Sequence, residues 1–276
     1  MPGLIDTHLH LYRDDFDEDR AAVRERAAAA GVAAFVHVGY DAETNERAQR
    51  IAAADPAGWA TAGIHPHDAE NHDDDFAAFA RAHRDTIIAI GECGLDYYRD
   101  LSPRDVQHRA FASQIALAEE LDLPMIFHVR DAYPDARAIL LEAGLPSRRG
   151  IFHAFAGDRE FARWAVDEGF KLGIGGVFTY KKAHLPEAIE GLPAEALQLE
   201  TDAPWLPPQP WRGKRNEPSF ARHTAEAIAA SLDTTVDAAS TIWAREFEAL
   251  FGVELPGDVR ALVPSDHPIP TKESSK

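Results

Sequence analysis

Residues 87–155 carry the pattern from which the fold follows. IIAIGE at 87–92, PMIFHV at 124–129 and GIFHAF at 150–155 are short apolar runs typical of buried strands. Ala- and Leu-rich sequence of helical character separates them. Strands that alternate with helices in this way predict a parallel sheet with crossover helices.

The same alternation extends over most of the chain. Further strands are expected at 4–8, 32–38, 60–64, 170–174 and 196–201, which makes eight. The helices are expected at 17–30, 43–54, 74–83, 103–121, 131–143, 158–168, 185–189 and 218–231. Eight β/α units predict an α/β fold, a slightly irregular (β/α)8 TIM barrel. An open dinucleotide-binding sheet is disfavoured, because no Gly-x-Gly-x-x-Gly follows the first strand.

The C-terminal part of the chain continues beyond these eight units. Residues 234–251 predict an extra C-terminal helix packed outside the barrel. We expect residues 1–255 to form a single barrel domain. Residues 256–276 are rich in Pro and Ser, which predicts a loosely ordered tail.

Composition limits the partners of this chain. The net charge is −18, from 28 Lys and Arg against 46 Asp and Glu, which argues against adhesion of the whole surface to nucleic acid or membrane. A local cationic site remains compatible with that charge. The first residues, MPGLIDTHLH, lack the features of a signal peptide, and Cys93 is the single cysteine. We therefore expect a cytoplasmic protein with no membrane partner and no obligate protein partner.

Potential metal ligands are placed at the carboxyl ends of the expected strands, where barrels of this type build their active sites. His8 and His10 are two residues apart on the first strand, so their side chains point to the same face. The later strands end in Glu92, His128, His153 and Asp202. Six nitrogen and oxygen ligands are therefore expected at one rim.

This donor set predicts a metal centre. Neutral imidazole and carboxylate bind zinc, manganese and similar divalent ions, and six ligands exceed the three or four that hold one catalytic zinc. Two divalent metal ions are the expected count, with Mg, Mn, Zn and Ni all left open. A carboxylate on a central strand can bridge two ions about 3.5 to 4 Å apart, and Glu92 is the candidate bridge.

Six segments carry a resemblance to a known family. They are DTHLH at 6–10, GIHPHD at 63–68, IGECGLDYY at 90–98, FHVRDA at 127–132, FHAFAG at 152–157 and LETDAPWLPPQPWRGKRNEP at 199–218. The sequence resembles the TatD family of metal-dependent deoxyribonucleases, within the wider metallo-dependent hydrolase (amidohydrolase-like) barrels. The matches cover essentially the whole barrel in order, and KRNEP at 214–218 is the most specific, since it serves no obvious packing purpose.

The resemblance implies a role for each ligand. One metal would be held by His8, His10, Glu92 and Asp202, and the other by Glu92, His128 and His153. Water on the two ions would become hydroxide and attack phosphorus, with Asp202 beside it to accept the proton. Asp202 and Glu92 are therefore the expected catalytic residues. No lysine stands at a strand end before Lys171 to provide the carboxylated bridge of the related amidohydrolases, which favours the nuclease branch.

Two pairs of residues are expected to support this centre. Asp6 and Glu200 each precede a ligand by two residues, so each side chain lies on the same face of the strand as that ligand. Each is expected to orient a ligand without binding the metal itself. His65 and His67 form a second His-x-His, with Pro66 between them. They are assigned either to phosphate contact or to a third, weaker metal.

Cations and aromatic residues follow the strand ends and are expected to contact substrate. The substrate-binding candidates are His65, Arg130, Lys214, Arg215 and Asn216. The other cations of this rim are Arg13, Arg99, Lys181, Lys182 and Arg212, and its aromatics are Tyr97, Tyr98, Tyr133, Phe155, Tyr180, Trp205 and Trp211. A locally cationic pocket with a few stacking rings suits single-strand ends or short oligonucleotides better than duplex DNA.

These observations predict a divalent-metal-dependent phosphodiester hydrolase. The resemblance implies a TatD-like deoxyribonuclease with 3′-5′ exonuclease action on single-stranded DNA, with RNA left open as a substrate. The alternative enzyme is an amidohydrolase, esterase or phosphotriesterase acting on a small molecule, because the same hydroxide could perform that reaction. The third hypothesis is a scaffold that binds metal or nucleic acid without turnover.

Overall fold

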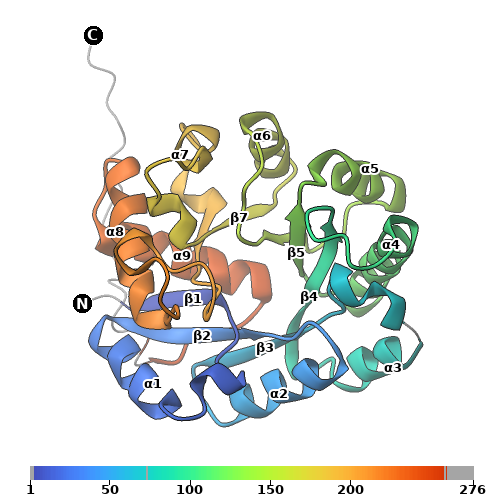
Figure 1. The fold of residues 1–276 in the computed structure, drawn as a ribbon, viewed down its shortest axis with the longest axis horizontal. Coiled ribbons are helices and arrows are strands. Elements are labelled where there is room, and N and C mark those ends of the chain that lie inside the picture. The colour runs from blue at the N-terminus through green and yellow to red at the C-terminus, as the bar shows by residue number, and fades with distance from the viewer. Residues whose placement is uncertain (1–2, 73, 258, 260–276) are drawn as a thin grey trace.

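The computed structural model describes residues 3–72, 74–257 and 259 (Figure 1). One sheet holds β1 (Leu4–Leu9), β2 (Val32–Val38), β3 (Gly58–Ala62), β4 (Ile87–Asp96), β5 (Met125–Arg130), β6 (Gly150–Phe152), β7 (Lys171–Ile174) and β8 (Leu197–Leu199). Neighbouring strands pair in parallel and in chain order from β1 to β8. The TIM barrel expected from the sequence is confirmed.

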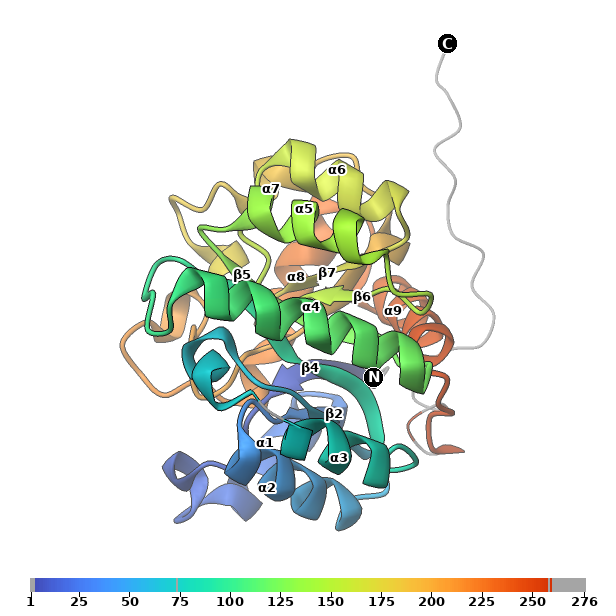
Figure 2. The same ribbon diagram turned by 90° about the vertical axis from the view of Figure 1, so that its right-hand side faces the viewer.

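Helices cover the outside of the strands in the same order. They are α1 (Arg20–Ala29), α2 (Ala42–Ala53), α3 (Asp74–Ala82), α4 (Arg104–Leu121), α5 (Tyr133–Ala143), α6 (Arg159–Asp167), α7 (Leu185–Ala188), α8 (Ala221–Ser231) and α9 (Val236–Phe251). Figure 1 shows α1 to α8 around the periphery, and Figure 2 shows α3, α4 and α5 side by side along one flank. Buried aromatic rings fill the layer between the sheet and the helices. The ring centre of Phe127 lies 4.7 Å from that of Phe152 and 6.0 Å from that of Phe111.

The barrel closes between β8 and β1 through a few specific contacts rather than a long ladder. The Asp202 amide donates to the His8 carbonyl at 2.9 Å, and the His10 amide donates to the Ala203 carbonyl at 2.9 Å. Asp6 adds a side-chain link, because it accepts from the Thr201 amide at 2.9 Å and from the Thr201 hydroxyl at 2.5 Å. This irregular closure fixes the strand that carries His8 against the loop that carries Asp202.

The extra C-terminal helix, α9, covers one end of the barrel. Phe247 and Leu250 of α9 belong to one buried cluster with Ile5, Ile88 and Ile126, which stand near the amino ends of their strands. The helix therefore lies outside the barrel, as expected, and covers its amino-terminal end. The carboxyl ends of the strands are left for the loops that form a site.

The strand ends differ from those expected. β4 continues past Glu92 to Asp96, because its pairing with β5 extends to Asp96 and Arg130. Gly94 lies within this longer strand. It is required by close strand approach, since a Cβ there would lie 2.1 Å from the carbonyl oxygen of His128, and its φ is +144°. β6 and β8 end earlier than expected, so His153 and Asp202 lie in the loops that follow them.

Two further expectations concern the C-terminal tail and the membrane. Of the tail expected at 256–276, only residues 256, 257 and 259 lie within the described part. None of the helices in that described part combines the length and the apolar character needed to cross a membrane.

Candidate metal centre

The six expected ligands come together at the carboxyl end of the barrel, with Glu92 between them. Its Oε2 lies 3.4 Å from Nε2 of His8. Its Oε1 lies 2.8 Å from Nδ1 of His128 and 2.9 Å from Nε2 of His153. The two oxygens of one buried carboxylate thus face two different groups of imidazoles, which is the geometry that a bridging ligand needs.

The first group contains His8, His10 and Asp202. Oδ1 of Asp202 lies 3.7 Å from Nε2 of His8 and 3.4 Å from Nε2 of His10. Nδ1 of His10 lies 2.8 Å from the Val38 carbonyl, to which it can only donate. Because a neutral imidazole carries one proton, Nε2 of His10 keeps its lone pair and directs it toward Asp202.

The atoms of this first group fit a divalent cation. Nε2 of His8 and Nε2 of His10 are buried and have no hydrogen-bond partner in the described part of the chain. Orphaned buried nitrogens of this kind are rare, since burial without a partner costs free energy. Ligands about 2.0 to 2.2 Å from a tetrahedral ion lie roughly 3.4 Å apart. The measured separations of 3.4 to 3.7 Å therefore leave space for an ion among these donors.

The second group contains His128 and His153, and the structure adds His65 to it. Nδ1 of His128 and Nε2 of His153 are 3.2 Å apart, and both approach the same oxygen of Glu92. Nε2 of His65 lies 3.5 Å from that oxygen. Nδ1 of His65 accepts from the His67 amide at 3.1 Å, so the proton of a neutral His65 is on Nε2. This tautomer favours a hydrogen-bond donor, as phosphate contact requires, over a third-metal ligand.

Asp96 is a site residue that the sequence reasoning missed. Its carboxylate is 1% exposed, and Oδ2 faces Nε2 of His67 at 2.9 Å and Nε2 of His128 at 3.1 Å. Burial alone would raise the pKa of Asp96, but the hydrogen bonds from His128 and His67 hold it below its usual value. The signal was present in the sequence, because residues 92, 94 and 96 of one strand share a face.

Glu200 and Asp6 support the backbone around the ligands. Oε1 of Glu200 accepts from the Ala154 amide at 2.6 Å and lies 3.8 Å from Nδ1 of His153. It thereby holds the residue after His153 in an unusual conformation, with φ +42°. Asp6 accepts from the His8 amide at 3.3 Å. Burial raises the pKa of Glu200 to about 8 and that of Asp6 to about 7.

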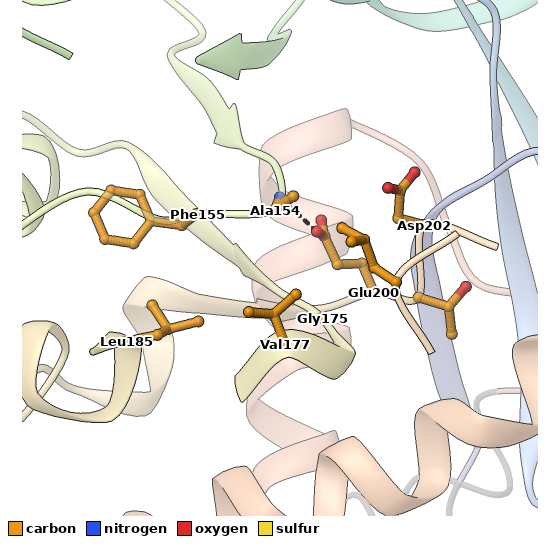
Figure 3. A pocket seen from close by; sticks show the side chains of 9 residues that line it. Ala154, Phe155, Gly175, Val177, Leu185, Glu200 and Asp202 are labelled. Atoms are coloured by element: carbon orange, nitrogen blue, oxygen red, sulfur yellow. Dashed lines mark hydrogen bonds between the residues drawn. The ribbon is translucent and has the colours of Figure 1, made fainter. Parts of the chain in front are cut away.

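A small pocket lies beside Asp202. Figure 3 shows Glu200 and Asp202 on one side of this pocket and the apolar side chains of Phe155 and Leu185 on the other. The dashed line in Figure 3 marks the hydrogen bond from the Ala154 amide to Glu200.

Arginines of the rim lie on aromatic rings, of which those of Tyr98 and Trp205 are exposed and that of Tyr180 is half-buried. The guanidinium carbon of Arg130 lies 3.9 Å from the ring centre of Tyr98, which is 62% exposed. Arg13 stacks in the same way on Trp205 at 4.9 Å, and Arg212 on Tyr180 at 4.6 Å. Such pairs combine positive charge with a planar face, which are the two features that bind single-stranded nucleic acid.

The KRNEP segment differs from its expected role. Lys214 is exposed, but Arg215 forms two hydrogen bonds with Asp19 at 2.7 and 2.9 Å. Asn216 is fully buried, and its Nδ2 donates to the carbonyls of Thr201 and Trp205 at 2.8 and 2.6 Å. The expectation that Asn216 contacts substrate is therefore corrected, because its amide is already committed to the turn that carries Asp202.

We expect Asn216→Ala to lower the free energy of unfolding by about 2–3 kcal/mol, because two carbonyls and the Glu217 amide lose their buried partner. Urea denaturation measures the change. Lys214→Ala in the same segment is the control and should stay within about 0.5 kcal/mol of the parent. Equal stability of the two variants would show that Asn216 does not hold this turn.

Comparisons with known proteins find similar sequences and a similar fold. A family model described as TatD related DNase matches residues 5–252. The chain is 41% identical to the uncharacterized metal-dependent hydrolase YabD of Bacillus subtilis, over 91% of this chain and 99% of YabD. It is 38% identical to the 3′-5′ ssDNA/RNA exonuclease TatD of Pantoea vagans, over 82% and 90% of the two chains. The crystal structure of YJJV, a TatD homolog from Escherichia coli, superposes with a TM-score of 0.85 at 30% identity, covering 91% of this chain and 98% of YJJV.

Proposed function

Since this chain belongs to the TatD related DNase family of metal-dependent hydrolases, we propose that it removes nucleotides from the 3′ ends of single-stranded DNA, with RNA as a second substrate. One observation carries the proposal. The carboxylate of Glu92 stands between two groups of imidazoles that are largely shielded from solvent, and its two oxygens face the nitrogens of the two groups separately. This arrangement supports a hydrolytic centre with two cations.

The residues divide between two cation positions. His8, His10 and Asp202 would hold one ion together with Oε2 of Glu92. His128 and His153 would hold the other together with Oε1. Divalent cations bound there would supply an activated water and neutralise the charge that develops on the phosphoryl oxygens.

The chain's own side chains would bind and orient the substrate. The Asp202 carboxylate, which lies 3.7 and 3.4 Å from the nitrogens of His8 and His10, is placed to accept the proton of the attacking water. The Nε2 proton of His65 is available to a phosphoryl oxygen. Tyr98 and Trp205 are exposed rings that bases can contact, and Arg130 beside Tyr98 can balance phosphate charge.

Single strands fit this rim better than duplex DNA. A base can lie flat on Tyr98 or Trp205 only after it leaves its own stack, which is easiest at a strand end. The net charge of −18 also opposes a long duplex along the surface. Relatives named 3′-5′ ssDNA/RNA exonuclease support the same substrate class and polarity. The buried, unpaired thiol of Cys93 supports a cytoplasmic location.

Hydrolysis of a small amide, ester or phosphotriester is the second candidate. The small pocket beside Asp202 favours it, because the apolar walls of Phe155 and Leu185 would suit a compact substrate. A nucleic acid would instead use the exposed rings of the rim. The two candidates therefore predict different sensitivity to loss of the rim residues.

Digestion of end-labelled oligonucleotides tests the proposal. We expect metal-dependent shortening of a single strand from its 3′ end, slower attack on the matched duplex, and little turnover of amide and ester panels. Tyr98→Ala should raise KM for the oligonucleotide. Turnover of a small ester without any oligonucleotide cleavage, with Mg, Mn, Zn and Ni each supplied, would overturn the nuclease proposal.

Removal of the metal should destabilise the protein. An ion at one hundred times its dissociation constant stabilises the folded state by about 2.7 kcal/mol, which is roughly 6–10 °C in Tm for a chain of this length. We therefore expect a chelator to lower Tm by that amount and added divalent metal to restore it. Thermal unfolding and elemental analysis of the same samples make the measurement, and an unchanged Tm after demonstrated metal loss would contradict it.

A further inference from the structure

The carboxylate of Asp96 has a hydrogen-bond donor on every side. Oδ2 faces Nε2 of His128 and Nε2 of His67. Oδ1 accepts from the backbone amides of Tyr98 at 3.0 Å and Arg99 at 2.8 Å. With 1% of the residue exposed, protein donors rather than water therefore satisfy both oxygens.

The backbone of Asp96 is held from a neighbouring helix. Gln107 is a fully buried residue of α4. Its Oε1 accepts from the Asp96 amide at 2.9 Å, and its Nε2 donates to the Asp96 carbonyl at 3.4 Å. Since the two backbone amides already hold Oδ1, the carboxylate has little freedom to rotate. Oδ2 is consequently a fixed acceptor at the edge of the His128 ring.

This acceptor gives the ring proton of His128 a partner on Nε2, the nitrogen that faces away from Glu92. A neutral imidazole has one N–H and one lone pair. Both nitrogens of His128 face carboxylate oxygens, with Nε2 3.1 Å from Oδ2 of Asp96 and Nδ1 2.8 Å from Oε1 of Glu92. A cation bound at Nδ1, beside Nε2 of His153 at 3.2 Å, would use the lone pair there, and Asp96 would then accept the one remaining ring proton on Nε2.

We propose that Asp96 is a positioning residue that fixes His128 with its Nδ1 lone pair toward the second cation position. The inference rests on the proposed function insofar as that function places a cation between Glu92, His128 and His153. Asp96 itself stays outside the set of ligands. Its effect reaches the cation only through the ring of His128.

Asp96→Asn is the direct test, measured by titration of Zn²⁺ or Co²⁺ into metal-free, full-length protein. The two backbone amides retain the carbonyl oxygen of Asn, so its NH₂ group faces Nε2 of His128. The proton of His128 then moves to Nδ1 and blocks the ligand. We expect one of two binding steps to weaken by 10- to 100-fold, with a change in the Co²⁺ absorption spectrum.

Asp135→Asn is the matched control. Asp135 is an acid exposed to solvent that accepts from the Tyr97 hydroxyl at 2.7 Å. This variant should bind both cations as the parent does. Two unchanged binding steps in Asp96→Asn would overturn the inference and leave the proposed function intact. Failure of the parent to bind a second cation would overturn both.

A measurement on the unaltered sequence keeps the inference testable if Asp96→Asn does not fold. Histidine ¹⁵N NMR of the zinc-loaded protein should show His128 with its proton on Nε2, and its signal is assigned by its loss in His128→Ala. A proton on Nδ1 would overturn the inference. If the expected tautomer and two cations are found but no oligonucleotide is cleaved, the inference stands and the proposed nuclease function fails.

Discussion

Glu92→Gln should lower kcat/KM for oligonucleotide hydrolysis by about a thousandfold or more while the chain stays folded. Glu92 is placed to bind both cations, because its oxygens face the His8 side and the His128 side separately. The glutamine amide nitrogen has no lone pair for a cation. Cations of this kind contribute several kcal/mol of transition-state stabilisation, and each 1.36 kcal/mol is a factor of ten in rate.

Metal stoichiometry and single-turnover rates measure this effect together. We expect fewer bound cations as well as slower cleavage, since both cation positions share the altered side chain. Glu120→Gln is the control, because Glu120 is an exposed acid that pairs with Arg81 on the outer surface. It should match the parent in both measurements. Parental metal content and rate in Glu92→Gln would disprove the bridging role.

Asp202→Asn should lower kcat by about 10²- to 10⁴-fold, the range that general acid–base groups supply. Asparagine can still offer an oxygen to a cation, but it takes up no proton from water. The substitution suits the backbone, because Asp202 has φ +59° and asparagine tolerates that left-handed conformation. The fold should therefore be unaffected, and the loss should fall mainly on kcat rather than on KM.

Steady-state kinetics with metal analysis checks this expectation. Asp122→Asn is the matched control, since Asp122 has φ +49° and is exposed at the end of α4. The control should retain full activity. If Asp202→Asn also keeps its kcat, Asp202 is not the proton acceptor. If it loses its cations along with its activity, its main role is that of a ligand.

Much of the fold and of the metal centre could be predicted from sequence because the signals are local. Alternating apolar strands and helices determine the barrel. Once the barrel is known, residues at the carboxyl ends of different strands must share one rim. That reasoning placed His8, Glu92 and Asp202 together although they are far apart in the chain. The structure brings Glu92 to 3.4 Å and Asp202 to 3.7 Å from Nε2 of His8.

The same local signals failed where a role depends on a distant partner. KRNEP looked like a substrate-binding segment, yet Arg215 pairs with Asp19 and Asn216 holds the carbonyls of Thr201 and Trp205. A positive charge or an amide in a loop predicts only that a partner is needed. Which partner it finds depends on how the loop packs against α1 and the barrel rim.

The sequence by itself determined the barrel and the kinds of donor atom at its carboxyl end, because period and residue type are properties of the chain. Only the tertiary structure decided which atom of each donor is free. Val38 on β2 accepts the Nδ1 proton of His10, and Asp96 on β4 faces Nε2 of His128. His10 therefore turns Nε2 toward the centre and His128 turns Nδ1, because the outer acceptor lies beside Nδ1 of His10 but beside Nε2 of His128.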